Sequence, residues 1–186
     1  MNIKRILVVS LTIVLLSGCV AQWQKVNSKN AKVTQQGMTI TLPDGWVTIA
    51  VNKNLTIASK DGPSLNSMLI ETIPFSTLEK VLETKIKSDM DVLEASKTYI
   101  SYWSKMNNVT DFDIVSEDYR EMDSVGHYFV EWTHRDSNGT TMRHVTQGTI
   151  KGKNLVKVSF SAPNIHYFNE NLPAFNQVVE QIEHAG

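Results

Sequence analysis

Three histidines are the side chains best suited to acid–base chemistry or metal binding in this chain of 186 residues. His127, His134 and His144 fall in neighbouring segments that alternate as strands do, and Ser137-Asn138-Gly139 is a hairpin signal. A two-residue turn would place His134 and His144 on opposite faces of the sheet, whereas a three-residue loop would place both on one face. We favour surface or hydrogen-bonded histidines over a metal site, and predict neither metal nor cofactor.

A run of carboxylates between residues 111 and 123 is a second candidate for cation binding. In a strand, Asp111, Asp113 and Glu117 would share a face, as Ca²⁺ ligands can, yet no Gly-bearing metal loop accompanies them. Charges on an edge strand also deter unwanted sheet pairing. We therefore interpret the run as solvated strand charge. Its members are Asp111, Asp113, Glu117, Asp118, Glu121 and Asp123.

Tyr99, Tyr102 and Trp103 form an aromatic group at helical spacing, and Met106 continues the same stripe. Residues at this spacing usually pack in a core. The alternatives are a groove that binds a partner and a surface on which a sugar stacks. We name these four residues as the possible partner surface.

The sequence contains none of the motifs of the common enzyme classes, such as Gly-X-Ser-X-Gly, His-Glu-X-X-His or a phosphate-binding glycine loop. We therefore predict no catalytic residues and a non-enzymatic protein. The competing hypothesis is a hydrolase acting on envelope material. That hypothesis requires His127, Glu131 and His144 to converge in one cleft.

The first nineteen residues have the pattern of a secretory signal. Lys4 and Arg5 precede the apolar run 6–16, which is much shorter than the roughly 20 residues that a membrane-spanning helix needs. The run ends in Leu16-Ser17-Gly18-Cys19, which resembles a bacterial lipobox. The resemblance implies cleavage before Cys19 and acylation of that residue, so residues 1–18 are the expected lipoprotein signal peptide.

An acylated Cys19 would anchor the protein in a membrane without spanning it. Under the sorting rule of Gram-negative lipoproteins, Val20 in place of an aspartate implies the periplasmic leaflet of the outer membrane. In a Gram-positive cell the same signal implies the outer face of the cell membrane. Because Cys19 is the only cysteine, the sequence excludes an internal disulfide and a multi-thiolate metal cluster.

The charge of the chain bears on its partners. Eighteen Lys and Arg stand against nineteen Asp and Glu, so the sequence lacks the basic excess of a nucleic-acid-binding protein. We predict two partners: the membrane, through the lipid on Cys19, and an envelope protein that the sequence does not identify. Residues 19–36 are rich in polar side chains, and we interpret them as the lipidated cysteine and a flexible tether. Residues 37–186 remain as one folded domain.

Within that domain, period-2 alternation and turn residues predict two groups of four strands, each followed by a helix. Ser76-Thr77-Leu78-Glu79 has the form of a capping box, and the following apolar stripe predicts a helix to about residue 105 that bends or restarts near Ser96. The order indicates an α+β fold, with a mostly antiparallel sheet covered by helices. The expected strands are 38–42, 46–49, 55–59, 67–73, 112–119, 126–134, 140–150 and 155–160, with the last helix at 165–183 and Pro173 inside it.

Several turn motifs carry a family resemblance. Gly37 is followed by Leu42-Pro43-Asp44-Gly45-Trp46, and Ser59-Lys60-Asp61-Gly62 comes before the central helix. This arrangement resembles the PsbP-like fold, a family that includes DcrB-like envelope lipoproteins. The resemblance covers roughly residues 37–183 and implies an accessory role, without assigning any site residue.

Taken together, these features predict a lipid-anchored periplasmic accessory or binding protein of the bacterial envelope. It would work by tethered recognition of a partner, because an anchor confines the search to one surface. The alternatives are the envelope hydrolase and a component of a secretion or phage-uptake machine.

Overall fold

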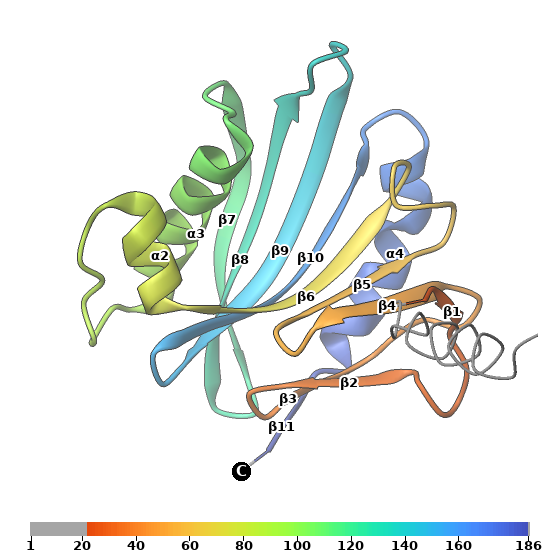
Figure 1. The fold of residues 1–186 in the computed structure, drawn as a ribbon, viewed down its shortest axis with the longest axis horizontal. Coiled ribbons are helices and arrows are strands. Elements are labelled where there is room, and N and C mark those ends of the chain that lie inside the picture. Colours follow the sequence, from red (N-terminus) through yellow and green to blue (C-terminus); the bar gives the residue numbers. More distant parts are fainter. Residues whose placement is uncertain (1–21, 186) are drawn as a thin grey trace, which may run out of the picture.

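The computed structural model describes residues 22–185, which form an α+β fold with two antiparallel sheets (Figure 1). The large sheet has eight strands in the order β1-β4-β5-β6-β10-β9-β8-β7, and the small sheet has the order β11-β3-β2. The predicted fold class is confirmed. The strands are β1 (Gln24–Lys25), β2 (Lys32–Gln35), β3 (Met38–Thr41), β4 (Val47–Asn52), β5 (Leu55–Ser59), β6 (Ser67–Pro74), β7 (Phe112–Met122), β8 (Val125–Arg135), β9 (Thr141–Lys151), β10 (Asn154–Pro163) and β11 (Glu183–His184).

Two meanders, β4–β6 and β7–β10, build most of the large sheet and join edge to edge where β6 pairs with β10. Asn154 of β10 faces Pro74, and Ser161 faces Ser67. Turns connect the strands within each meander, and the longest of them, residues 60–66, joins β5 to β6. The chain therefore crosses over only once between the two halves, through the two helices that follow β6.

Helices cover both faces of the large sheet. The helices α2 (Phe75–Leu82) and α3 (Val92–Asn107) pack over one face, and α4 (Tyr167–Glu180) packs over the other (Figure 1). One apolar core lies between the sheet, α4 and the small sheet, and a second lies between the sheet, α2 and α3. Because successive strand residues point to opposite faces, each central strand contributes to both cores.

The central helix differs from the prediction of one helix reaching residue 105. The chain leaves the helical conformation at Glu83, whose φ is 56°, and returns to it only at Val92. Asp91 begins the second helix, because its carboxylate accepts a hydrogen bond from the backbone N–H of Glu94 at 2.7 Å. The restart therefore lies near residue 91 and not near Ser96.

The expected capping box at Ser76 does not form. The residue before α2 is Pro74, which makes no side-chain capping bond. The Glu79 carboxylate accepts from the backbone N–H of Ile86 at 3.1 Å and so holds the connection between the helices.

The flexible tether expected over residues 19–36 is corrected for its described part, from residue 22 onward. β1 pairs with β4, and β2 pairs with β3. Val26 is 2% exposed, and its N–H donates to the carbonyl of Trp46 at 2.8 Å. Gln36 and Gly37 both have positive φ, which suits the tight β2–β3 hairpin. The signal peptide and Cys19 lie outside the described residues.

The last helix is shorter than the predicted 165–183, and Pro173 lies inside it. After α4 the chain forms β11, which pairs with β3. Across residues 22–185, no helix has the length and apolar character needed to cross a membrane.

Candidate functional site

A row of four residues crosses the face of the sheet beneath α3. Tyr128 of β8 faces Gly148 of β9, Gly148 faces Lys157 of β10, and Lys157 faces Glu71 of β6. Facing residues in antiparallel strands point to the same side. The register therefore places a lysine and a glutamate together under α3.

Lys157 is a charged side chain inside the fold. Its side chain is 1% exposed, and its Nζ lies 3.1 Å from Oε2 of Glu71. The same Nζ donates to Oγ of Ser159 at 3.0 Å and lies 4.6 Å from the centre of the Tyr99 ring. A buried ammonium is tolerated only with such compensation.

The electrostatics of this pair keep Lys157 charged. Burial by itself would lower the pKa of Lys157, but Tyr99 and Glu71 outweigh the burial and raise that pKa above its usual value. Lys157 is therefore an ammonium throughout the physiological range. The Glu71 side chain is 23% exposed, so this carboxylate connects the buried charge to the surface.

Gly148 makes room for Tyr128 next to this pair. A Cβ at position 148 would stand 2.6 Å from the hydroxyl and from Cζ of Tyr128. The Tyr128 hydroxyl is buried and has no hydrogen-bond partner among the described residues. Tyr99 of α3 stacks on the Tyr128 ring, with a centroid distance of 6.5 Å.

The predicted partner surface lies on α3 and forms one wall above this row. Tyr99 is 3% exposed and packs against Trp132, so it belongs to the core. Tyr102 and Trp103 are half-buried, whereas Met106 is 56% exposed. Burial and the nearby Glu71 carboxylate raise the pKa of Tyr102, which keeps its phenol neutral.

Two histidines hold Trp103 from the sheet side. The loop after β8 has three residues, because Asp136 N–H donates to the Thr140 carbonyl, and the open question about the hairpin is thereby resolved. His134 and His144 share a face, with Nδ1 of His134 at 2.9 Å from Nε2 of His144. Both rings meet Trp103 edge-on, at centroid distances of 5.0 and 4.9 Å.

These histidines are neutral at physiological pH. Burial, followed by His134 and Lys157, lowers the pKa of His144 to about 3. Burial also lowers the pKa of His134. Neither ring therefore adds positive charge beside Trp103.

Between α3 and the sheet these side chains line a cleft of about 240 Å³, which we call the α3 cleft. It brings all four residues of the predicted partner surface together with the Lys157–Glu71 pair and His144. Sequence reasoning missed Lys157 and Glu71. The residues that line it are Leu69, Glu71, Tyr99, Tyr102, Trp103, Met106, Asn107, His144, Lys157, Ser159 and Ser161.

The histidine and glutamate required by the hydrolase hypothesis do not join His144. His127 and Glu131 point to the α4 side of β8, because they alternate with Tyr128, Val130 and Trp132. Glu131 accepts from Nε of Arg143 at 2.6 Å. The three residues that a hydrolase would need are therefore split between the two faces.

His127 instead pairs with the last strand. Its Nε2 lies 2.9 Å from Nε2 of His184 in β11. Burial, followed by His184 and Lys151, lowers the pKa of His127 to about 4. The pair links the small sheet to the large one.

Four residues of the carboxylate run lie on β7, the edge strand of the large sheet, where most side chains are exposed, and Asp111 and Asp123 flank it. Glu117 accepts from Oγ of Ser96 at 2.6 Å, and Asp118 pairs with Arg120 at 3.7 Å. Within the part of the chain that the structure describes, no three His, Cys, Asp or Glu side chains gather as metal ligands would.

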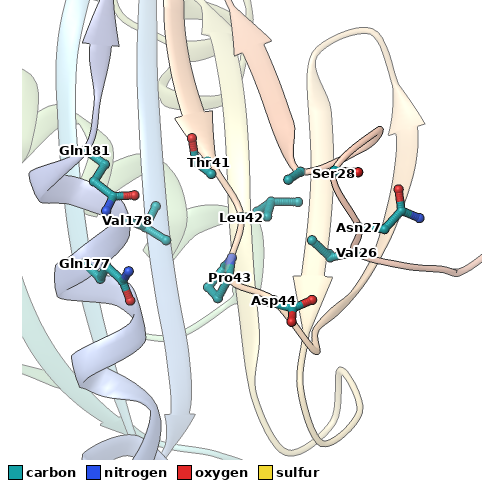
Figure 2. Close-up of a pocket in the computed structure, with 11 residues that line it drawn as sticks. Val26, Asn27, Ser28, Thr41, Leu42, Pro43, Asp44, Gln177, Val178 and Gln181 are labelled. Atoms are coloured by element: carbon teal, nitrogen blue, oxygen red, sulfur yellow. The ribbon is translucent and has the colours of Figure 1, made fainter.

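A larger hollow of about 560 Å³ lies on the α4 side of the molecule. Figure 2 shows Gln177 and Val178 of α4, with Gln181 just after the helix, on one side of it and the N-terminal segment on the other. Asp44 is the only titratable side chain among the residues that line it. This hollow offers far less chemistry than the α3 cleft.

Comparison with known proteins shows the fold. No protein-family model and no curated protein matches the sequence. The solution structure of cyanobacterial PsbP (CyanoP) from Synechocystis sp. PCC 6803 is similar over 92% of this chain and 99% of its own, with 10% identity and a TM-score of 0.55. The Ran-binding protein Mog1p of Saccharomyces cerevisiae is similar over 89% of this chain and 96% of its own, with 11% identity and a TM-score of 0.57.

A third solved structure, a putative regulator of unknown function from Pseudomonas aeruginosa, is similar over 83% of this chain and 96% of its own, with 9% identity and a TM-score of 0.51. At identities this low the likeness concerns the fold alone. The expected PsbP-like architecture is thus confirmed, and it is shared by PsbP and Mog1p.

Proposed function

We propose that this chain is a lipid-anchored, non-enzymatic binding protein of the bacterial cell envelope. Cys19 carries the lipid, the folded domain lies in the periplasm at the outer membrane, and the α3 cleft recognises an envelope partner. In a Gram-positive cell the same anchor would hold the domain at the outer face of the cell membrane.

The anchor rests on the signal pattern of residues 1–19. Only four residues lie between Cys19 and Gln24, the first residue of β1, and the five Cα-to-Cα steps from one to the other span about 17 Å at most. The domain would therefore sit close to its membrane. A protein confined in this way meets membrane-resident partners at a raised effective concentration.

The composition of the α3 cleft carries the recognition part of the proposal. Tyr102, Trp103 and Met106 present partly exposed apolar surface next to the Glu71 carboxylate. Aromatic side chains around a few fixed polar groups are typical of binding sites. Mog1p, which shares the fold, is a binding protein by its name.

The cleft also lies well away from the anchor. β1 forms one edge of the eight-stranded sheet, whereas the strand residues that line the cleft lie on β6, β10 and β9, three to five strands away. At roughly 4.8 Å between neighbouring strands, this separates the cleft from β1 by about 14–24 Å. The lipid would leave the cleft accessible to a partner.

Intact mass and membrane fractionation test the anchor. The native protein should carry acyl groups on Cys19 and sediment with membranes, whereas a Cys19→Ala variant should be unacylated and leave the membrane fraction. A wild-type protein that is unacylated and freely soluble would overturn both the proposed lipid anchor and the proposed location at the membrane.

Photo-crosslinking in cells tests the recognition. A photoreactive side chain at Met106 should give one adduct with an envelope protein, and Trp103→Ala should abolish it. The matched control position is Ile165, which is 81% exposed and lies before α4, outside the cleft. Equal adducts from both positions, or none from Met106, would remove the cleft as the partner site.

The identity of that adduct would also decide between a stand-alone accessory protein and a component of a secretion or phage-uptake machine.

A further inference from the structure

The charge arrangement in the α3 cleft indicates the chemistry of its occupant. Lys157 is satisfied from within the fold by Glu71, Ser159 and the Tyr99 ring, and its side chain is 1% exposed. An anionic ligand would have to displace Glu71 from a lysine that solvent barely reaches. Such a displacement would leave the Glu71 carboxylate without its partner.

Glu71, in contrast, has an oxygen available to a ligand. Oε2 faces Lys157, whereas Oε1 has no hydrogen-bond partner among residues 22–185. Glu71 and Tyr102 line both the α3 cleft and an adjoining hollow that reaches the β4–β5 hairpin. A cation at Oε1 would complete an alternating series of positive, negative and positive charge.

The walls of the cleft favour the same kind of ligand. Tyr102 and Trp103 are aromatic side chains, and the faces of such rings attract cations. His144 and His134 are neutral, so neither imidazole repels a cation there. A planar guanidinium can stack on an aromatic ring and donate hydrogen bonds to a carboxylate at the same time, which an ammonium does less well.

The size of the cleft limits the occupant to a side chain. A volume of 240 Å³ corresponds to about eight water molecules, which is enough for one long side chain and too little for a helix about 10 Å across.

We propose that the α3 cleft binds an arginine side chain presented by its protein partner, with the guanidinium on Oε1 of Glu71 and against the rings of Tyr102 and Trp103. This inference rests on the proposed function, because it names the chemistry that the partner must present to that cleft.

Fluorine NMR of the full chain, purified in detergent micelles with 5-fluorotryptophan, tests the inference directly. The probes are N-acetyl-L-arginine amide and its neutral isostere N-acetyl-L-citrulline amide. The Trp103 resonance, assigned with Trp103→Phe, should shift saturably as the arginine probe is added. The protein should bind the citrulline probe at least about tenfold more weakly than the arginine probe. The Trp46 resonance should stay unchanged, because Trp46 is 2% exposed and packs in the other core.

Three variants separate binding from folding. Glu71→Gln should weaken the binding of the arginine probe at least about tenfold. If that variant does not fold, Tyr102→Leu provides the test instead. It removes an aromatic wall of the cleft at the surface of the helix and should weaken the binding of the arginine probe several-fold. The matched control is Glu83→Gln, since Glu83 is 82% exposed after α2 and lies outside the cleft.

Equal affinity for arginine and citrulline probes would overturn the inference, and so would the absence of a saturable Trp103 shift. Preferential binding of N-acetyl-L-aspartate amide would overturn it in favour of an anionic ligand. If Met106 gives an adduct in cells but the purified protein does not bind the arginine probe, this inference is overturned and the proposed function stands. Arginine binding without acylation or adduct would overturn the proposed function and leave only the arginine specificity of the cleft standing.

Discussion

Tyr128 in β8 lies across Gly148 in β9, so close that a Cβ at position 148 would stand 2.6 Å from its hydroxyl. The glycine is therefore the space that the tyrosine fills, and the tyrosine in turn supports Tyr99 of α3. One missing side chain in the sheet sets how closely the helix of the α3 cleft can approach it.

Gly148→Ala should destabilise the fold by about 1–3 kcal/mol, because the new methyl group meets a fully buried ring that has no free space to move into. Urea unfolding measures the loss. The control is Gly126→Ala, whose Cβ would meet Tyr119, a side chain that is 47% exposed and free to turn outward. An equal cost at both glycines would contradict this explanation.

The Lys157–Glu71 pair should show strong coupling. Lys157→Met alone and Glu71→Leu alone should each cost about 3 kcal/mol, because each change leaves one charge without its partner in or near the core. The double variant should lie within about 1 kcal/mol of the wild type, since it removes both charges at once. Chemical unfolding of the four proteins measures the cycle, and additive losses would show that the pair does not interact as described.

The stability should fall as the pH drops below 6.5, and His144 should contribute to that fall. Its pKa is about 3 in the fold against 6.5 in an unfolded chain, so below pH 6.5 the unfolded state binds a proton that the folded state does not. Stability is therefore fully present above pH 6.5 and is lost toward pH 3. This one group removes about 2 kcal/mol between pH 7 and pH 5.

A His144→Phe variant should lose less stability than the wild type over that interval, as measured by urea unfolding at each pH. The control is His166→Asn, because the His166 side chain is 69% exposed and lies outside the cleft. An unchanged pH slope in the His144 variant would show that this imidazole is not buried in its neutral form.

The restart of the central helix depends on Asp91. Asp91→Ala should cost about 1 kcal/mol, because the N–H of Glu94 loses its acceptor at the start of α3. Asp89→Ala is the matched control, since Asp89 is exposed two residues earlier in the same connection. Thermal unfolding compares the two, and equal shifts in Tm would remove the cap as the cause.

The sequence pattern predicted most of the sheet because β3 to β10 alternate or are bounded by strong turn residues such as Asn138-Gly139. It failed at the central helix because two capping patterns compete there. Ser76-X-X-Glu79 and Asp91-X-X-Glu94 have similar forms, and only the second makes its capping bond. The local sequence does not show which of these two capping patterns will be used, because tertiary packing decides between them.

Residues 22–36 were missed for a different reason. Their composition is that of a tether, yet Val26 is buried, the pairing of β1 with β4 and of β2 with β3 holds them against the domain, and Gln36-Gly37 makes the turn between β2 and β3. A few buried contacts can outweigh the average polarity of a segment.

Only part of the candidate site could be predicted from the sequence. Tyr102, Trp103 and Met106 were recognisable from their helical spacing, but Lys157 looks like a solvent-facing strand residue in the sequence. Its role depends on the register that sets it opposite Glu71, 86 residues earlier in the chain. Cross-strand register between distant segments is not visible in local periodicity.

β1 also determines how this protein would respond to mechanical load. It is held by the pairing of Gln24 with Thr48 and of Lys25 with Val47, followed by the bond from Val26 to Trp46. A pull on the chain before residue 22, directed away from the sheet, would break these contacts one after another. Peeling residues 24–31 from the domain would free about 26 Å of extended chain while β4 to β10 stay folded. With Cys19 anchored as proposed, β1 would then let the domain move farther from the membrane under load without losing the rest of its fold.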